Sequence, residues 1–315
     1  MKSRLILPRI VLSLLFITII LLPHNHILAD DKLICSQSTE AYTSQVKPED
    51  GIRFAVIGDY GTLSYFSQRV ADMVTSWNPD FIVTVGDNNY PSGAEETIDD
   101  NIGQLYGDYI GNYNGNFGNG SALNNFYPIL GNHDWRTGEA GPYFEYFTLP
   151  GNERYYDFVR GPIHFFMLDS HRLEPDGIDD ESIQAQWLQS VLATSTSPFQ
   201  VVIAHHPPYS SSEDNATPAL RWPFAEWGAD AVITGHAHHY ERFEQDGIPY
   251  IVNGSGGHIP LYDFQDVLED GSIIQDNCNF GAIQVDADDN TMTMRFISVT
   301  VEGYVIDQIT INADR

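Results

Sequence analysis

The 315-residue chain is long enough to bury a full hydrophobic core, and its 42% hydrophobic and 12% aromatic residues exclude an intrinsically disordered protein. It carries 43 Asp and Glu against 15 Lys and Arg, a formal charge of −28. Such an acidic surface repels polyanions, which excludes nucleic acid as a partner, whereas small phosphorylated substrates stay compatible because bound cations would invert the local field.

The first 29 residues have the layout of an export signal. Three basic residues among the first nine precede an apolar run over residues 10–22, and residues 27–29 (Ile-Leu-Ala) offer a small residue for cleavage before Asp30. The run of 13 residues is shorter than a membrane span, which needs roughly 20. We therefore predict a cleaved signal peptide over residues 1–29 and a secreted or periplasmic protein. The alternative is an uncleaved anchor, which would place the protein on a membrane.

Residues 30–50 are polar and are predicted to form an extended lead-in to a single domain over residues 51–315. Removal of residues 1–29 would leave 12 basic and 43 acidic residues, a formal charge of −31. The two cysteines, Cys35 and Cys278, could pair in an oxidising compartment, and two unpaired thiols are the alternative.

From residue 52 onward, apolar runs alternate with helical spacing. Strands are predicted over residues 52–57, 81–85, 126–130, 155–160, 163–168, 199–204, 231–234, 248–252, 282–285, 291–299 and 304–311. Helices are predicted over residues 66–77, 183–192 and 217–227, the last kinked or divided by Pro223. Residues 93–125 are predicted to hold a helix and then a Gly/Asn-rich insertion, a surface loop or alternatively a substrate-gating loop. This order predicts an α/β sandwich of two sheets with flanking helices.

Polar residues directly follow five of the apolar runs. The five segments are Gly58-Asp59-Tyr60-Gly61, Gly86-Asp87-Asn88-Asn89-Tyr90, Gly131-Asn132-His133-Asp134, Val202-Ile203-Ala204-His205 and Gly235-His236-Ala237-His238. Each segment alone is an ordinary turn. If the chain stays extended after Gly235, His236 and His238 point the same way, toward one site. Five strand ends that carry nitrogen and oxygen donors predict a metal site at the edge of a sheet.

These segments, in this order, resemble the pattern GDxG, GDxxY, GNH(D/E), VxxH and GHxH of the purple acid phosphatases, within the calcineurin-like metallophosphoesterase superfamily. The resemblance covers residues 58–238 and extends to the C-terminal strands. The run over residues 235–242 resembles plant-type members, whereas the compact length is closer to the small mammalian-type members. The resemblance implies an α/β fold of the metallophosphoesterase type, a β-sandwich of two mixed sheets flanked by helices.

The resemblance also implies a dinuclear metal site. The implied Fe(III) ligands are Asp59, Tyr90 and His238; the implied ligands of a second, divalent metal (Fe, Zn or Mn) are Asn132, His205 and His236; and Asp87 would bridge the two. Carboxylates and phenolate are hard anionic donors that favour Fe(III), whereas imidazole and an amide oxygen suit the divalent ion. A phenolate on Fe(III) gives visible charge-transfer colour. The structural alternative for Tyr90 is a packed aromatic side chain.

His133 is implied to be catalytic, because in the family this residue touches the substrate phosphate or protonates the leaving oxygen. One position departs from the pattern: small mammalian-type members carry a further outer histidine nine residues after the VxxH histidine, and here that residue is Asp214. The proton donor and the pH optimum are therefore open. Outside the motifs, we expect a turn role for Asp169 and a His206 side chain that points away from His205. His258 either borders the site or is a plain loop residue.

The function implied by the resemblance is that of a secreted acid phosphatase. It would hydrolyse phosphate monoesters by attack of a metal-bound hydroxide at a dinuclear Fe(III)–M(II) site. A phosphodiesterase or nucleotide hydrolase that uses the same two metals is the alternative enzyme. The alternative from another class is a binding protein that keeps a metal site without catalysis.

Overall fold

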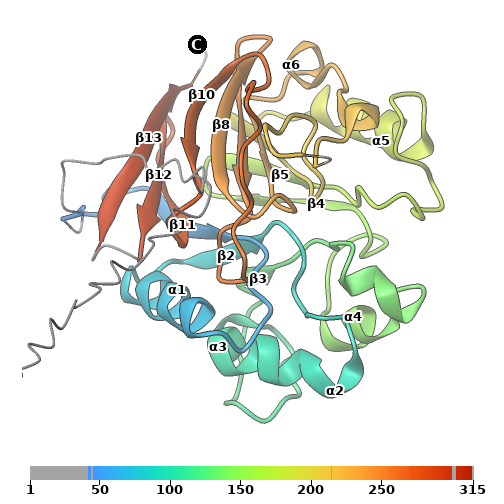
Figure 1. Ribbon diagram of the computed structural model, residues 1–315, viewed down its shortest axis with the longest axis vertical. Helices are drawn as coiled ribbons and strands as arrows, with labels where there is room; N and C mark the ends of the chain where they lie inside the picture. The colour runs from blue at the N-terminus through green and yellow to red at the C-terminus, as the bar shows by residue number, and fades with distance from the viewer. Residues whose placement is uncertain (1–41, 44, 214, 300–302, 314–315) are drawn as a thin grey trace, which may run out of the picture. The chain divides into compact units, whose positions relative to one another are not determined.

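The computed structural model describes residues 42–43, 45–213, 215–299 and 303–313. The predicted signal peptide, Cys35 and Asp214 lie outside these residues, so the predictions made for them stay predictions. Within the described residues the strands form two mixed β-sheets, and helices flank them (Figure 1). This arrangement confirms the predicted fold class.

The first sheet contains six of the described strands. Their bounds are β1 Ile52–Ile57, β2 Phe81–Thr84, β3 Phe126–Tyr127, β11 Gly281–Ala287, β12 Thr291–Ser298 and β13 Tyr304–Asn312. They pair in the order β13-β12-β11-β1-β2-β3. The pairs β1–β2 and β2–β3 are parallel and the other pairs are antiparallel. The carboxyl ends of β1, β2 and β3 therefore lie at one edge of this sheet.

The second sheet contains seven of the described strands. Their bounds are β4 Tyr156–Arg160, β5 Ile163–Met167, β6 Phe199–Ile203, β7 Ala231–Thr234, β8 Tyr240–Gln245, β9 Ile248–Asn253 and β10 Ser272–Asp276. They pair in the order β10-β8-β9-β7-β6-β5-β4, and β5, β6, β7 and β9 run parallel to one another. The loops that follow β6, β7 and β9 therefore leave the sheet at the same edge.

The helices fall into two groups (Figure 1). Their bounds are α1 Tyr65–Ser76, α2 Glu95–Ile98, α3 Gln104–Tyr106, α4 Gly141–Tyr146, α5 Ile183–Leu192 and α6 Phe224–Trp227, with a π-helical turn η1 at Asp99–Gly103 and 3₁₀ turns η2 Gly107–Tyr109, η3 Asp134–Thr137 and η4 Pro218–Leu220. Helices α1 to α4 lie on one side of the sheets, and α5 and α6 lie on the other. Ser64 and Ser67 form a capping box that starts α1.

Aromatic side chains join the two sheets in the core. Phe54 of β1 stacks on Phe81 of β2 with ring centroids 4.9 Å apart, and Phe165 of β5 contacts both rings edge-on at 5.2 and 5.7 Å. All three side chains are buried. Each such pair adds about 0.5–1.5 kcal/mol beyond its buried area. A second buried cluster, with Leu188 of α5 and Phe224 of α6, covers the other face of the seven-stranded sheet.

Several elements differ from the predictions. β3 ends at Tyr127 rather than residue 130, because Pro128 follows and the chain turns toward the site. β8, β10 and α4 were not predicted. The predicted helix over residues 217–227 is divided into η4 and α6 before and after Pro223, as expected. None of the described helices is long and apolar enough to cross a membrane.

The Gly/Asn-rich insertion is a surface loop that one carboxylate holds in place. Asp99 Oδ1 accepts hydrogen bonds from the hydroxyls of Tyr113 at 2.6 Å and Tyr146 at 2.8 Å. Its other oxygen accepts from the backbone N–H of Asn116 at 2.7 Å. Burial opposes ionisation of Asp99, but these hydrogen bonds outweigh it and lower its pKa. The insertion is therefore anchored to η1, which favours the surface-loop prediction over a gating role.

Candidate metal centre

The five predicted segments converge at the edge where the two sheets meet, and glycines make the close approach possible. A Cβ on Gly131 would lie 2.2 Å from Asp87 Oδ1, and one on Gly235 would lie 2.6 Å from Asp59 Oδ2. Gly86 has φ +93° and its Cβ would meet the His205 ring at 2.6 Å. These glycines therefore set how closely the polar side chains can gather.

Three predicted ligands have a left-handed backbone. Asp59 and Asp87 have φ 52° and His236 has φ 68°. Such a conformation costs a residue other than glycine about 1–3 kcal/mol, and it persists only where surrounding contacts hold it. For His236 that contact is its backbone N–H, which donates to Asp59 Oδ2 at 2.9 Å. His236 is thus held in its strained conformation by another predicted ligand.

The donors predicted to hold Fe(III) surround one point. The Tyr90 hydroxyl lies 3.2 Å from Asp59 Oδ1, 2.8 Å from Asp87 Oδ2 and 3.2 Å from His238 Nε2. Asp59 Oδ1 and His238 Nε2 are 3.4 Å apart. Tyr90 is only 5% exposed, and Asp59 is fully buried. Two carboxylates, a phenol and an imidazole with their polar atoms this close fit a hard trivalent cation.

The remaining predicted donors form a second group. Asn132 Oδ1 lies 3.1 Å from His205 Nε2 and 2.9 Å from His236 Nδ1. Asp87 Oδ1 lies 3.4 Å from His205 Nε2, while its other oxygen faces Tyr90. The two oxygens of Asp87 thus face the two groups. This donor set fits a divalent ion of the Fe, Zn or Mn type beside the first position, with Asp87 between them.

Backbone carbonyls orient two of the imidazoles. His205 Nδ1 donates to the Val85 carbonyl at 2.7 Å, and His238 Nδ1 donates to the Pro260 carbonyl at 3.2 Å. Each of these bonds leaves Nε2 unprotonated in the neutral ring and pointed at the centre. Outer hydrogen bonds of this kind fix the tautomer and orientation of histidines that bind metals.

The protonation states of two predicted ligands, Asp59 and Tyr90, suit a site that binds cations. Burial opposes ionisation of Asp59, but the hydrogen bond and charge of His238, with the other histidines, lower its pKa to about 2. Burial and the charges of Asp87 and Asp59 raise the pKa of Tyr90 well above its usual value. The phenol therefore stays protonated until a cation offsets the two carboxylates.

Residues 52–240, more than half of the chain, match the family model described as calcineurin-like phosphoesterase. The chain belongs to the calcineurin-like phosphoesterase family. Purple acid phosphatase 22 of Arabidopsis thaliana is 27% identical over 206 residues, which are 62% of this chain and 46% of the relative. Tartrate-resistant acid phosphatase type 5 of Mus musculus is 25% identical over 254 residues, which are 68% of this chain and 75% of the relative.

A solved structure of a purple acid phosphatase from yellow lupin (Lupinus luteus) seeds has the same fold. It superposes with a TM-score of 0.69 at 18% identity over 87% of this chain and 55% of that one. These comparisons confirm the predicted resemblance to purple acid phosphatases. The chain spans about half the length of the two plant proteins, with shares of 46% and 55%. Membership of the family implies a dinuclear metal site, and the two donor groups on either side of Asp87 agree with that implication.

His133 lies at the rim of the centre. Its Nδ1 donates to the Pro91 carbonyl at 2.7 Å, so a proton on Nε2 makes the ring cationic. That Nε2 lies 3.9 Å from Asp87 Oδ2, and the ring is 4.2 Å from the Tyr90 ring. Burial outweighs the attraction of Asp87 and lowers the pKa of His133. The side chain is thus placed to give up a proton beside the two donor groups.

The backbone after β7 has a different conformation from the extended one that was expected. Residues 235–239 are not extended: Ala237 N–H donates to the Gly235 carbonyl at 2.8 Å, and His239 N–H donates to the Ala237 carbonyl at 2.7 Å. His236 and His238 still face the centre, but they face different donor groups. The expectation of alternating strand positions was therefore wrong, although both residues reach the predicted site.

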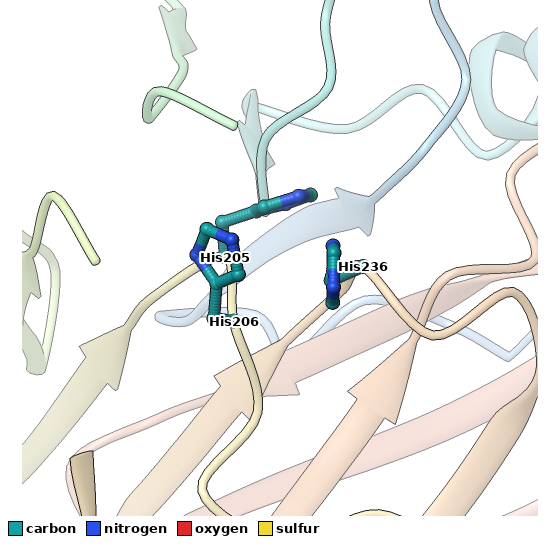
Figure 2. Close-up of side chains that lie close together, drawn as sticks. All are labelled: His205, His206 and His236. Carbon is teal, nitrogen blue, oxygen red and sulfur yellow. The ribbon is translucent and has the colours of Figure 1, made fainter. Parts of the chain in front are cut away.

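His206 also lies differently from the prediction. Figure 2 shows its ring beside those of His205 and His236, on the loops that follow β6 and β7. The ring centroids of His206 and His236 are 4.5 Å apart, and donor atoms of all three histidines lie close enough to share one ion. The extended chain that would turn His206 away ends at Ile203. His206 therefore borders the divalent side of the centre.

Two further groups, Ser170 and Asp134, support the site and were not predicted to do so. Ser170 Oγ accepts the backbone N–H of His205 at 3.1 Å and that of His206 at 2.8 Å. Asp134 accepts from the Gly131 backbone at 2.8 Å, and burial, with the charge of Asp87, raises its pKa to about 7. Asp134 was visible as the last residue of its motif, whereas nothing in the sequence singles out Ser170.

Asp169 has the structural role predicted for it. Its carboxylate accepts from the indole N–H of Trp135 at 3.0 Å and from the backbone N–H of His171 at 2.9 Å, and it is fully buried. His258 borders the site, since its ring stacks on that of Tyr90 with centroids 3.9 Å apart.

Proposed function

We propose that the chain is a metal-dependent phosphatase that hydrolyses phosphate monoesters at a dinuclear Fe(III)–M(II) site. One observation carries the proposal: the two oxygens of Asp87 face two separate donor groups, one at Tyr90 and one at His205. A binding protein needs no such pair of groups with an imidazole at the rim. The purple acid phosphatases that the chain resembles support the same activity.

Two bound cations would polarise a phosphate ester and acidify a water molecule for attack on phosphorus. The chain's own residues account for the rest. The carboxylates of Asp59 and Asp87 lie in a buried centre, and their oxygens would determine where the cations bind. The left-handed backbone at both positions keeps their oxygens in place before substrate arrives. His133 is placed to hold a proton near the leaving oxygen through its Nε2.

Phosphate release separates the proposed activity from its alternatives. The metal-loaded protein should hydrolyse p-nitrophenyl phosphate well and bis-p-nitrophenyl phosphate poorly, and chelation should abolish both reactions. A preference for the diester would establish the phosphodiesterase instead. A protein that keeps its metals but hydrolyses neither ester would be a binding protein.

We propose that this activity is exported. The support is the basic start, the 13-residue apolar run and the small residue before Asp30. The expected result is a mature protein that begins near Asp30 and is recovered outside the cytoplasm. N-terminal sequencing of the exported protein is the measurement. Recovery of intact Met1 in a membrane fraction would favour the uncleaved anchor.

A further inference from the structure

A loop on the Fe(III) side contacts all three predicted ligands of that ion. The loop spans residues 254–262 (Gly-Ser-Gly-Gly-His-Ile-Pro-Leu-Tyr) and follows β9; we call it the glycine loop. The backbone N–H of His258 donates to the Asp59 carbonyl at 3.1 Å. The Pro260 carbonyl accepts from His238 Nδ1 at 3.2 Å.

Two rings of the glycine loop pack on ligand rings. His258 stacks on Tyr90 with centroids 3.9 Å apart and planes inclined by 23°. Tyr262 stacks on His238 at 4.2 Å and 19°, and its backbone N–H donates to the His238 carbonyl at 2.8 Å. Flat contacts of this kind define the plane of the ring they cover. His258 therefore limits the rotation of the Tyr90 ring, which His133 contacts as well at 4.2 Å.

The glycine loop is itself held firmly. Gly257 has φ +139° and its Cβ would lie 2.5 Å from the Ser67 backbone. Its carbonyl accepts from the Ser64 hydroxyl at 2.7 Å, at the start of α1. Gly256 N–H donates to the Gly58 carbonyl at 2.9 Å. His258 is thus presented to Tyr90 from a fixed backbone.

The divalent side has a different support. Ser170 accepts the backbone N–H groups of His205 and His206, and it lies 2.9 Å from His206 Nδ1. Among the described residues, the glycine loop contacts Asp59, Tyr90 and His238, and none of its hydrogen bonds or ring contacts runs to His205 or His236. Two different loops therefore support the two halves of the centre: the glycine loop and the loop that carries Ser170.

We propose that His258 is a positioning residue that supports the Fe(III) half of the centre selectively, by holding the ring of Tyr90, while Ser170 supports the divalent half. The inference rests on the proposed function for the identity of the metals. His258 acts through its flat ring, because its buried Nδ1 has no hydrogen-bond partner among the described residues. The phenyl ring of His258→Phe should therefore preserve this support, whereas the methyl group of His258→Ala should not.

The test uses the full chain loaded with Fe(III) and Zn(II), and it measures metal content after dialysis against a chelator together with the visible charge-transfer band. His258→Ala should release iron about 10–100-fold faster, the usual scale for an outer support, and should shift or weaken the band, with zinc retained. His258→Phe should restore both readouts. Ser170→Ala should lose zinc first and keep the band. Tyr90→Phe calibrates the band, since removal of the phenolate should abolish it.

Several other results would overturn the proposal. Unchanged iron release and an unchanged band in His258→Ala would show that the stack does not position Tyr90. Equal loss of both metals, or an unfolded protein, would make His258 a general structural residue. A wild type that binds no iron would overturn this inference and the metal assignment together. A wild type that holds both metals and shows the band, yet releases no phosphate, would refute only the proposed activity.

Discussion

Asp87→Asn should lose both metal occupancy and turnover, each by more than about 100-fold, because a neutral amide would replace the one carboxylate that faces both donor groups. The change keeps the size of the side chain, so the fold should survive. The measurement is metal content per chain beside the rate of phosphate release at saturating p-nitrophenyl phosphate.

A matched control is Asp72→Asn, which makes the same chemical change at an exposed position of α1. This variant should keep its metals and its rate. If Asp87→Asn kept both metals and lost only rate, Asp87 would act on the substrate rather than between two cations. If it kept full activity, the dinuclear assignment would be wrong.

His133→Ala should keep both metals and lose rate by about 10²–10⁴, the usual scale for a positioned acid or base. The loss should be largest for alkyl phosphates, whose basic leaving oxygen needs a proton. It should be small for p-nitrophenyl phosphate, whose leaving group is stable as an anion. The measurement is kcat across a series of esters that differ in leaving-group pKa.

The same residue predicts a pH dependence. Burial lowers the pKa of His133, so the cationic ring that can donate a proton exists only on the acidic side of its usual range. Hydrolysis of alkyl phosphates should therefore fall as pH rises through that pKa, and His133→Ala should remove this fall. His164→Ala, which changes a histidine paired with Asp157 on the β4–β5 hairpin, is the control and should leave the profile unchanged.

Equal losses across the ester series would mean that His133 only positions the phosphate. Loss of metal from His133→Ala would instead show that the ligand set is wrong at the Gly131-Asn132-His133 segment.

The sequence predicts those strands whose burial comes from continuous apolar runs, such as β1, β6 and β7. It misses β8 because Tyr240–Gln245 contains charged residues, two of which have partners far away in the sequence. Glu241 accepts the Ser211 N–H at 2.9 Å, and Arg242 pairs with Asp307 at 2.6 Å. Such pairs join residues far apart in the chain, so no local pattern reveals them.

At the metal centre the sequence identifies which residues gather but not how they gather. His236 adopts its left-handed backbone because its N–H reaches Asp59, 177 residues away. The supports at Ser170 and His258 belong to loops that lie far from the motifs in the sequence and meet them only in the fold. The motifs therefore predict the chemistry, while tertiary packing sets its geometry.

In the proposed centre, Asp87 would lie between two cations, one beside Tyr90 and one beside Asn132. Anomalous X-ray diffraction on crystals of the metal-loaded protein, recorded on both sides of the iron edge and of the edge of the second metal, tests it directly. We expect two peaks about 3.5–4 Å apart, with iron on the Tyr90 side and an oxygen of Asp87 on each ion. A single peak, or two ions that do not share Asp87, would contradict it.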